Sequence, residues 1–454
     1  MKIPPRSRGR IVARARGSYL ARHLVLPAQR FVHTEVSSGI VLLAAAVAAL
    51  LWANSRWAGS YEALWSVDAS LRVGRFAIEH SLREWVNDAL MVVFFFVVGL
   101  EVKREFLCGA LSDWQRAALP VVSAIGGMII PAMLYMAFNY AQPTARGWGI
   151  PMATDIAFAL GVLALLGDRI AASLRIFLLA LATVDDIGAI LVIALFYSEG
   201  LVPIALVFAL VLVAMLVSMQ RLGVRNLLYY APVAVLFWFA VLASGVHATI
   251  AGVVLGFVTP IRPFMTKEAY SETALALVDD VQHATTNGDI DRGEAILGQI
   301  EELTAATEAP ADRLIRLVHP WSSYVVLPLF ALANAGVRLS AETIQQALTS
   351  TASTGILVGL TAGKPLGIVL FGLLAVRLGL ARQLAGVRWA QMVGVGLLGG
   401  IGFTVSLFIS GLAFSDASVI PSARIAILAA SVVAGLAGYL LLRIVSGQQQ
   451  QNAT

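Results

Sequence analysis

Six ionisable side chains lie inside segments that are otherwise apolar enough to cross a lipid bilayer. They are Asp88, Asp155, Asp185, Asp186, His247 and Lys364. An ionised aspartate at the centre of a bilayer costs roughly 2.5–3.5 kcal/mol on insertion scales, so such residues normally face a bundle interior or a watery cavity. Six of them in one chain predict a pathway for ions or protons.

Two adjacent carboxylates, Asp185 and Asp186, stand at the middle of the apolar stretch "LATVDDIGAILVIAL" (181–195). Neighbouring residues on a helix point about 100° apart, so the two can address different partners. Burial and mutual repulsion make them candidates to take up and release protons near neutral pH. Once deprotonated, they offer hard oxygen ligands for a small cation. This chemistry predicts the exchange of a cation for protons.

A helix break is predicted beside Asp155 in "PMATDIAFALGVLALLGD" (151–168). Pro151 removes a helical hydrogen bond and crowds the preceding turn, so the backbone should open near Thr154 and Asp155 and free carbonyls to line a cavity. "GLLGGIGFTVS" (396–406) indicates a second break, although close helix packing explains its glycines equally well. The two positions are consistent with inverted repeats formed by predicted helices three to five and ten to twelve.

Lys364 precedes Pro365 inside the apolar stretch "LTAGKPLGIVL" (360–370). An unpaired ammonium is expensive there, so Lys364 should pair with Asp155 or Asp185, or lose its proton. Either outcome couples the lysine to transport. The alternative is a lysine whose ammonium extends to the membrane interface.

The composition predicts an all-α polytopic membrane protein. Of 454 residues, 59% are hydrophobic and 13% are charged, and the mean hydropathy is +0.82. A spanning helix needs roughly 20 mainly apolar residues. That length gives about twelve candidate spans, near residues 36–54, 84–106, 118–138, 148–166, 174–197, 202–220, 227–243, 247–261, 320–336, 353–377, 391–412 and 423–443.

Charge predicts the orientation in the membrane. Residues 1–34 hold eight basic residues and no acidic one, which resembles a transit peptide or a signal n-region. With the N-terminus inside, however, the cytoplasmic segments hold 24 of the 32 Lys and Arg residues and the opposite side holds 7. This asymmetry satisfies the positive-inside rule with both termini cytoplasmic, so the partner is the lipid bilayer and nucleic acid is unnecessary. The lone Cys108 excludes an internal disulfide and Cys-rich metal sites.

The sequence divides into five parts, and two polar segments, an external hairpin (60–80) and an acidic insertion (266–312), interrupt its apolar pattern. The parts are a basic extension (1–34), eight spans that include the hairpin (35–265), the acidic insertion (266–312), four spans (313–445) and a polar tail (446–454). "DASLRVGRFAIEH" (68–80) alternates like two strands, and pairing of its open edge predicts a homodimer; an ordinary surface loop is the alternative.

The acidic insertion holds eleven acidic residues against Lys267 and Arg292. Its apolar residues fall at helical spacing on both sides of "TTNGD" (285–289), which predicts a cytoplasmic helical hairpin. Its role is regulatory or partner-binding, or it is a solvated spacer.

The sequence closely resembles the NhaA-type sodium/proton antiporters of bacterial inner membranes. The matching stretches are "WVNDALMVVFFFVVGLEVKREF" (85–106), "AIGGMIIPAMLYMAFNY" (124–140), "ATDIAFALGVLALLGDR" (153–169), "DDIGAILVIALFY" (185–197), "SGVHATIAGVVLGF" (244–257), "HPWSSYVVLPLFALANAGV" (319–337), "GKPLGI" (363–368) and "GIGFTVSLFI" (400–409). They span nearly the whole chain outside the extension, the insertion and the tail.

This resemblance implies twelve helices with crossed, interrupted helices four and eleven, a cytoplasmic funnel and a homodimer with an external hairpin. It implies pH-regulated, electrogenic exchange of Na+ or Li+ for H+ by alternating access, with no cofactor. Asp186 and Asp155 would be the main cation carboxylates beside Thr154, while Asp185 and Lys364 would form a proton-sensitive ion pair. Positions connected with folding, the funnel or pH response would be Asp88, Glu101, Arg104, Glu105, His247 and His319.

The chain departs from the family before "HPW", where Ile315 and Arg316 replace a glutamate and a histidine of its best-known members. The pH profile therefore cannot be transferred. His247, taken alone, would read as a structural histidine.

Other classes fit less well. An intramembrane aspartyl protease lacks its "YD" and "GxGD" motifs here, so no enzyme is expected. A sodium-coupled organic-anion symporter of related fold is the alternative function. A passive channel is disfavoured because the acids suit binding and release.

Overall fold

The computed structural model describes residues 35–451 except 74–75, 199, 225–226, 264, 266, 287–288 and 417. The predicted basic extension 1–34 therefore lies outside the described residues. This described part of the chain is almost wholly helical, as expected for a protein that must satisfy its backbone polar groups inside lipid.

The described residues contain twelve candidate membrane segments, in agreement with the twelve predicted spans. Seven continuous helical segments are long and apolar enough to cross a membrane: Leu82–Cys108, Trp114–Asn139, Ala172–Phe196, Pro203–Arg221, Pro310–Asn334, Thr351–Arg377 and Val419–Ser446. Two shorter apolar helices, α11 (Tyr230–Ala243) and α12 (Thr249–Val258), and three bent helix pairs supply the rest.

Four of the seven continuous segments are single helices. They are α7 (Trp114–Asn139), α9 (Ala172–Phe196), α10 (Pro203–Arg221) and α22 (Val419–Gln451). The last of these extends well past the predicted span and into the tail.

Three continuous segments each contain one π-helical turn, in which an extra residue widens the helix. Their helices and π turns, written η, are α5 (Leu82–Trp85), η2 (Val86–Leu90), α6 (Met91–Cys108), α15 (Pro310–Trp321), η7 (Ser322–Val326), α16 (Leu327–Asn334), α18 (Thr351–Val358), η8 (Gly359–Gly363) and α19 (Lys364–Arg377). The turn η2 contains Asp88, η8 ends just before Lys364, and η7 begins shortly after His319. Such turns are frequent at functional sites, and here each adjoins a predicted functional residue.

Predicted helices four and eleven are both broken at mid-length, as expected. The fourth consists of the 3-10 helix η4 (Pro143–Met152) and α8 (Ile156–Leu165), bent by 42°. The eleventh consists of α20 (Trp389–Gly399) and α21 (Phe403–Ala413), bent by 47°. The two breaks touch, because the backbone N–H of Asp155 donates to the carbonyl of Ile401 at 2.6 Å. Each break thereby satisfies part of the other's freed backbone.

The first span is the third bent pair, with α3 (Glu35–Ala53) followed at 115° by α4 (Ala58–Trp65). This turn is too sharp for α4 to prolong the span. The chain then forms an antiparallel hairpin of β1 (Asp68–Val73) and β2 (Phe76–Ser81), in which Asp68 pairs with Ser81.

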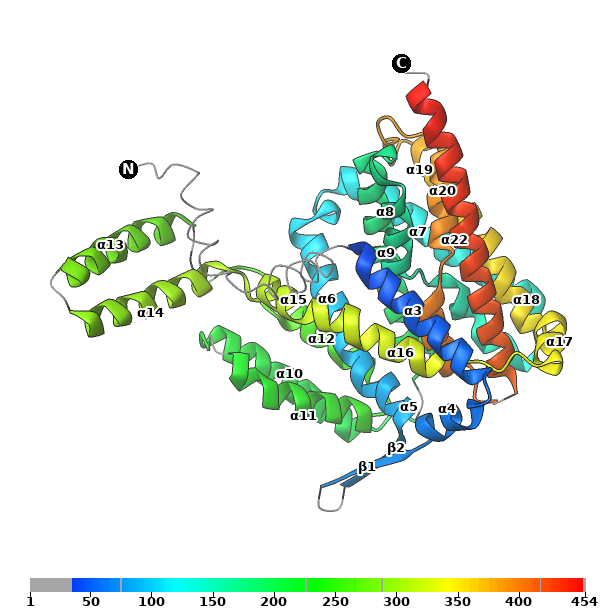
Figure 1. Ribbon diagram of the computed structural model, residues 1–454, viewed down its shortest axis with the longest axis horizontal. Coiled ribbons are helices and arrows are strands. Elements are labelled where there is room, and N and C mark those ends of the chain that lie inside the picture. Colours follow the sequence, from blue (N-terminus) through cyan, green and yellow to red (C-terminus); the bar gives the residue numbers. More distant parts are fainter. Residues whose placement is uncertain are drawn as a thin grey trace.

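The acidic insertion forms two packed helices, α13 (Lys267–Thr286) and α14 (Ile290–Thr307). They stand apart from the main body at the left of Figure 1, while the β-hairpin projects at the bottom. We call these two sides of the molecule the insertion side and the hairpin side.

Small residues bring the third and tenth spans into close contact. A Cβ built on Gly126 of α7 would lie 2.3 Å from the carbonyl oxygen of Gly367 in α19, and one on Gly367 would lie 2.1 Å from the carbonyl oxygen of Gly126. Only hydrogen side chains allow this approach. The contact holds Lys364, at the start of α19, against α7 and away from lipid.

Candidate functional site

Asp185 and Asp186 lie together near the middle of α9 but face different surroundings. Asp185 is fully buried, and its Oδ2 accepts hydrogen bonds from Lys364 Nζ at 2.5 Å and from the hydroxyl of Thr154 at 2.7 Å. Asp186 is 5% exposed and accepts no hydrogen bond within the described part of the chain. One carboxylate is therefore committed to protein partners, and its neighbour is free to take a ligand.

Lys364 pairs with Asp185 rather than with Asp155. Both side chains of the pair have no exposed surface. A buried charge without a partner would be expensive, so each charge makes the other tolerable. The second oxygen of Asp185, Oδ1, is buried and has no hydrogen-bond partner among the described residues. The pair is therefore incompletely satisfied.

Asp155 caps two helices at once. It is the N-cap of α8, where its Oδ1 accepts from the backbone N–H of Phe158 at 3.1 Å. Its Oδ2 accepts from Thr404 in the first turn of α21, from the backbone N–H at 3.1 Å and from the hydroxyl at 2.5 Å. Helix N-termini carry partial positive charge, so this crossing stabilises a carboxylate without any basic side chain.

Thr154 links the two acidic positions. Its hydroxyl lies within hydrogen-bond distance of Asp185 Oδ2 and of the Gly399 carbonyl, which is 2.8 Å away at the C-terminal end of α20. One hydroxyl proton can serve only one acceptor at a time. The Thr154 hydroxyl can therefore donate its proton either to Asp185 or to the Gly399 carbonyl. Which of the two it chooses depends on the charge of Asp185.

A cavity of about 310 Å³ leads from these residues toward the insertion side. Asp155, Asp186 and Thr154 line its inner part, together with Thr183 and Thr404. The lining also includes four predicted funnel residues, Glu101, Arg104, Glu105 and His319. The structure therefore brings most of the predicted site residues around one polar cavity, while Asp185 and Lys364 lie behind its wall.

The outer part of this cavity carries weakly paired charges. His319 Nε2 lies 3.7 Å from Glu101 Oε1, and Arg104 Nε lies 3.7 Å from Asp312 Oδ1 at the end of the insertion. These side chains are about half exposed, so solvent and salt screen them. They form a hydrated mouth rather than a rigid gate.

Two predicted residues lie elsewhere, on the hairpin side of the site. The backbone carbonyl of Asp88 in η2 accepts from Trp238 Nε1 at 3.2 Å. His247 contacts the hydroxyl of Thr249 at 3.2 Å, and its ring packs edge-on against Phe408. Neither residue lines the cavity.

Sequence reasoning missed Thr404 and two serines of the cavity wall, Ser322 and Ser323. A signal for Thr404 was present, because it follows the glycine-rich break in "GIGFT" and sits where the N-terminus of the second half-helix must begin. The serines had no comparable signal, since serine is common in membrane helices.

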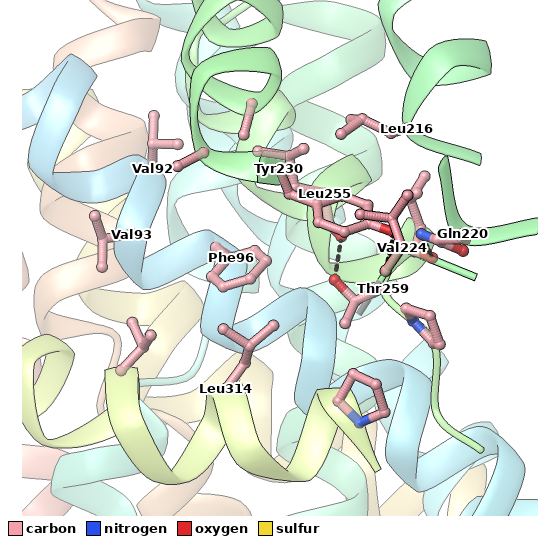
Figure 2. Close-up of a pocket in the computed structure, with 16 residues that line it drawn as sticks. Val92, Val93, Phe96, Leu216, Gln220, Val224, Tyr230, Leu255, Thr259 and Leu314 are labelled. Atoms are coloured by element: carbon pink, nitrogen blue, oxygen red, sulfur yellow. Dashed lines mark hydrogen bonds between the residues drawn. The ribbon is translucent and has the colours of Figure 1, made fainter. Parts of the chain in front are cut away.

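A second cavity, of about 400 Å³, is apolar and lies away from these charges. Figure 2 shows Phe96 of α6 and Leu314 of α15 facing it, with Leu255 of α12 and Leu216 of α10 also in its wall. Among the described residues that line it, none is charged. Its lining offers no carboxylate to hold a cation, and it is not part of the polar pathway.

Comparison with known proteins identifies the family of the chain. The sequence model of the family described as Na+/H+ antiporter 1 matches residues 29–442. The chain is 46% identical over 427 residues to Na(+)/H(+) antiporter NhaA 2 of Sorangium cellulosum, covering 94% of this chain and 91% of that protein. It belongs to the NhaA family of Na+/H+ antiporters.

Two further relatives of this NhaA-family chain show the same extent of similarity. NhaA of Escherichia coli O1:K1 / APEC is 46% identical over 419 residues, with 91% of this chain and 97% of the relative covered. NhaA of Rhodopirellula baltica is 46% identical over 416 residues, with 92% and 93% covered. The chain is thus a multi-pass membrane transporter of sodium ions and protons, and not an enzyme.

Proposed function

We propose that Asp186, Asp155 and Thr154 form the cation site of this antiporter, which accepts Na+ or Li+ from the insertion side. The observation that carries the proposal is the free carboxylate of Asp186, which faces the same polar cavity as Asp155. Carboxylate and hydroxyl oxygens are the ligands that small hard cations prefer. When the cation leaves, protons take its place on the same carboxylates, so the site cannot carry both loads together.

Asp185 and Lys364 form the proton-linked pair of this proposal. Protonation of Asp185 would remove the charge that holds Lys364 and free the Thr154 hydroxyl from its Oδ2 acceptor. Because the two side chains share one buried ion pair, we assign the second proton to the pair rather than to either residue. If the site takes up more protons than the single charge that it releases with sodium, exchange is electrogenic.

The insertion side faces the cytoplasm in this proposal. The support is the excess of Lys and Arg in the predicted segments of that side. Alternating access then exports sodium across a bacterial inner membrane, driven by the inward proton gradient. The physiological role of this transport is salt tolerance or alkaline pH homeostasis.

The insertion is proposed to adjust the pH response. Arg316, which departs from the family, makes a two-pronged ion pair with Glu308 at the end of the insertion, with distances of 3.0 and 2.6 Å. His319 of the cavity wall lies one turn further along α15. Removal of residues 268–308 should therefore shift the pH midpoint or the apparent sodium affinity; unchanged values would make the insertion a spacer.

The β-hairpin is proposed to join two copies of the chain. A two-stranded sheet has two open edges, and pairing with another hairpin would cover one of them. Deletion of residues 69–79 should convert a dimer in detergent to a monomer.

The cation site is tested in everted vesicles from antiporter-deficient cells. The pH gradient is followed after addition of Na+, Li+ or K+ between pH 6 and 9. The chain should collapse the gradient with Na+ and Li+, and Asp186→Asn should abolish the collapse, whereas Glu342→Gln on the exposed helix α17 (Ala341–Thr349) should leave it intact. Near-normal exchange by Asp186→Asn would refute the assignment. Sodium-dependent uptake of an organic anion in place of exchange would favour the symporter.

A further inference from the structure

An aromatic layer closes the pathway between the acidic site and the hairpin side. Phe408 of α21 lies 5.5 Å from Phe95 of α6 and 6.2 Å from Phe330 of α16, measured between ring centroids. All three rings are nearly or fully buried. Phe408 lies one turn beyond Thr404 in α21, so the layer begins directly past the site.

A polar chain lies beyond this layer and crosses three helical segments. A guanidinium nitrogen of Arg424 in α22 donates to Asn334 Oδ1 at 3.3 Å. The amide of Asn334 at the end of α16 donates to Asn87 Oδ1 in η2 at 2.8 Å, and also to the Phe330 carbonyl at 3.1 Å. The polar chain is thus attached to the aromatic layer through the turn that ends α16.

The bond from Arg424 to Asn334 joins two parts of the fold that pack mainly within themselves. In the described structure α22 packs mainly against α18, α20 and α21, whereas α16 packs mainly against α3 and η7. The first group belongs to predicted helices ten to twelve, one of the two repeats, and the second group lies outside both repeats. The two groups also meet through a smaller contact between α16 and α21, which includes Phe330 and Phe408, so Arg424 adds a polar bridge to a boundary with limited packing.

The cost of this arrangement indicates a role beyond packing. Arg424 Nε is buried and has no hydrogen-bond partner among the described residues. A buried unsatisfied donor is destabilising, so the guanidinium is held in a site that satisfies it only in part. Such a group can leave its site at lower cost than a fully bonded one.

We propose that Arg424 is a latch that holds the hairpin side closed while the cavity is open on the insertion side. The proposal rests on the alternating access of the proposed function. In it, the repeat that carries α21 and α22 moves against α16 and η2, so that the Arg424–Asn334 bond breaks and Phe408 parts from Phe330. Arg424 is a positioning residue, which touches neither the cation nor the acidic site.

Arg83 provides a matched control on the same side of the molecule. Its Nε donates to the Ala333 carbonyl at 3.2 Å, next to Asn334, and it forms an ion pair with Glu62 at 3.2 Å. These contacts join α5, α16 and α4, all of which lie outside the repeats. Arg83 and Arg424 carry like charges that repel each other, so loss of Arg83 removes an arginine beside the same turn without weakening the Arg424–Asn334 bond or releasing the repeat.

The test measures two distances between spin labels by pulsed electron paramagnetic resonance on the full chain. The parent is the Cys108→Ser variant. Unlabelled protein is added so that a dimer rarely contains two labelled chains. Spin labels at Arg338→Cys and Asp416→Cys report the hairpin side. Labels at Arg313→Cys and Arg382→Cys report the insertion side. All four positions are exposed and outside the Arg424 network.

Arg424→Leu should lengthen the hairpin-side distance and shorten the insertion-side distance. Arg424→Lys should shift both distances in the same directions but by less. Arg83→Leu should change neither distance. Unchanged distances in Arg424→Leu would overturn the latch. A longer distance on the hairpin side alone would also overturn the latch, because it indicates local loosening. The same paired shift in Arg83→Leu would overturn it as well. Thermal unfolding in detergent identifies any variant that has failed to fold, and Arg424→Lys then decides.

The parent chain separates the latch from the transport mechanism. Saturating Na+ against low pH should change its two distances in opposite directions if access alternates. A parent that responds while Arg424→Leu resembles it refutes the latch alone. A parent that does not respond refutes ion-driven switching in the proposed function, whereas a paired shift in Arg424→Leu would still show that Arg424 holds the hairpin side closed.

Discussion

Asp185 and Asp186 are adjacent in α9, yet they belong to two different regions of the molecule. Asp185 faces the dry contact between α9, the helix-four break and α19, where Lys364 and Thr154 hold it. Asp186 faces the polar cavity and has no hydrogen-bond partner among the described residues. Neighbouring residues on one helix point about 100° apart, and this difference in direction separates a paired carboxylate from a free one.

The difference teaches how the same residue type acquires two tasks. In the dry region a carboxylate must be paired, because an unpaired buried charge costs several kcal/mol. In the cavity a carboxylate can remain free, because water and an arriving cation compensate its charge. Mutations in the dry region should therefore change stability as well as proton coupling, and mutations in the cavity should change mainly ion affinity.

The largest effect is expected from breaking the buried pair. Lys364→Gln leaves Asp185 without a counter-charge and should lower the free energy of unfolding by roughly 3–5 kcal/mol. The double variant Asp185→Asn, Lys364→Gln should recover most of that stability, because no charge remains buried. Denaturant unfolding in detergent measures both.

The control for the buried pair is Lys103→Gln. Lys103 Nζ only donates to the carbonyls of Phe257 and Thr259 and is partly exposed. The Lys103→Gln variant should lower the free energy of unfolding by about 1 kcal/mol. A double variant no more stable than Lys364→Gln would show that the pair is not held by its charge.

Thr404→Val should affect the cavity rather than the fold. The change removes the hydroxyl donor to Asp155 Oδ2 but keeps the shape of the side chain. Hydrogen bonds to charged groups contribute about 1.5–3 kcal/mol, so the apparent sodium affinity should fall by about tenfold or more. Because the lost bond favoured the charged carboxylate, protons should compete better and activity should begin at higher pH.

Sodium titrations of the pH gradient at several pH values measure the effect of Thr404→Val. The matched control is Thr361→Val, whose hydroxyl bonds only to the Leu357 carbonyl of its own helix. A sodium affinity equal to that of the parent would show that Asp155 does not contribute to cation binding.

Glu101→Gln at the mouth of the cavity should have a smaller effect. The carboxylate lies 3.7 Å from His319 and is 40% exposed, so it attracts cations through solvent. We expect the apparent sodium affinity to fall by about two- to threefold at low ionic strength and the difference to vanish at high salt. A loss that persists at high salt would instead indicate direct coordination by Glu101.

The smallest effect is expected where the insertion meets the cavity mouth. Arg104 and Asp312 are 3.7 Å apart and half exposed, and such pairs contribute less than about 1 kcal/mol. A double-mutant cycle with Arg104→Gln and Asp312→Asn, followed by unfolding, should give a coupling energy below that value. A larger coupling would mean that the insertion is fixed to the funnel, which would strengthen its proposed regulatory role.

The sequence by itself determined the helical fold, the positions of the spans and the breaks in helices four and eleven. It did so because each depends on local features: the length of an apolar run, a proline beside Asp155, and the glycines before Phe403. It also marked the charges, since an ionisable residue in an apolar run stands out without any knowledge of its neighbours.

Only the tertiary structure decided which charges meet. From the residues alone Lys364 could pair with Asp155 or Asp185, and the close approach of α7 and α19 at Gly126 and Gly367 places it on Asp185. Likewise, only the crossing of the two breaks brings Thr404 to Asp155 across 249 positions. Partners so distant in sequence leave no local pattern, because their contact depends on how whole helices pack rather than on the residues beside them.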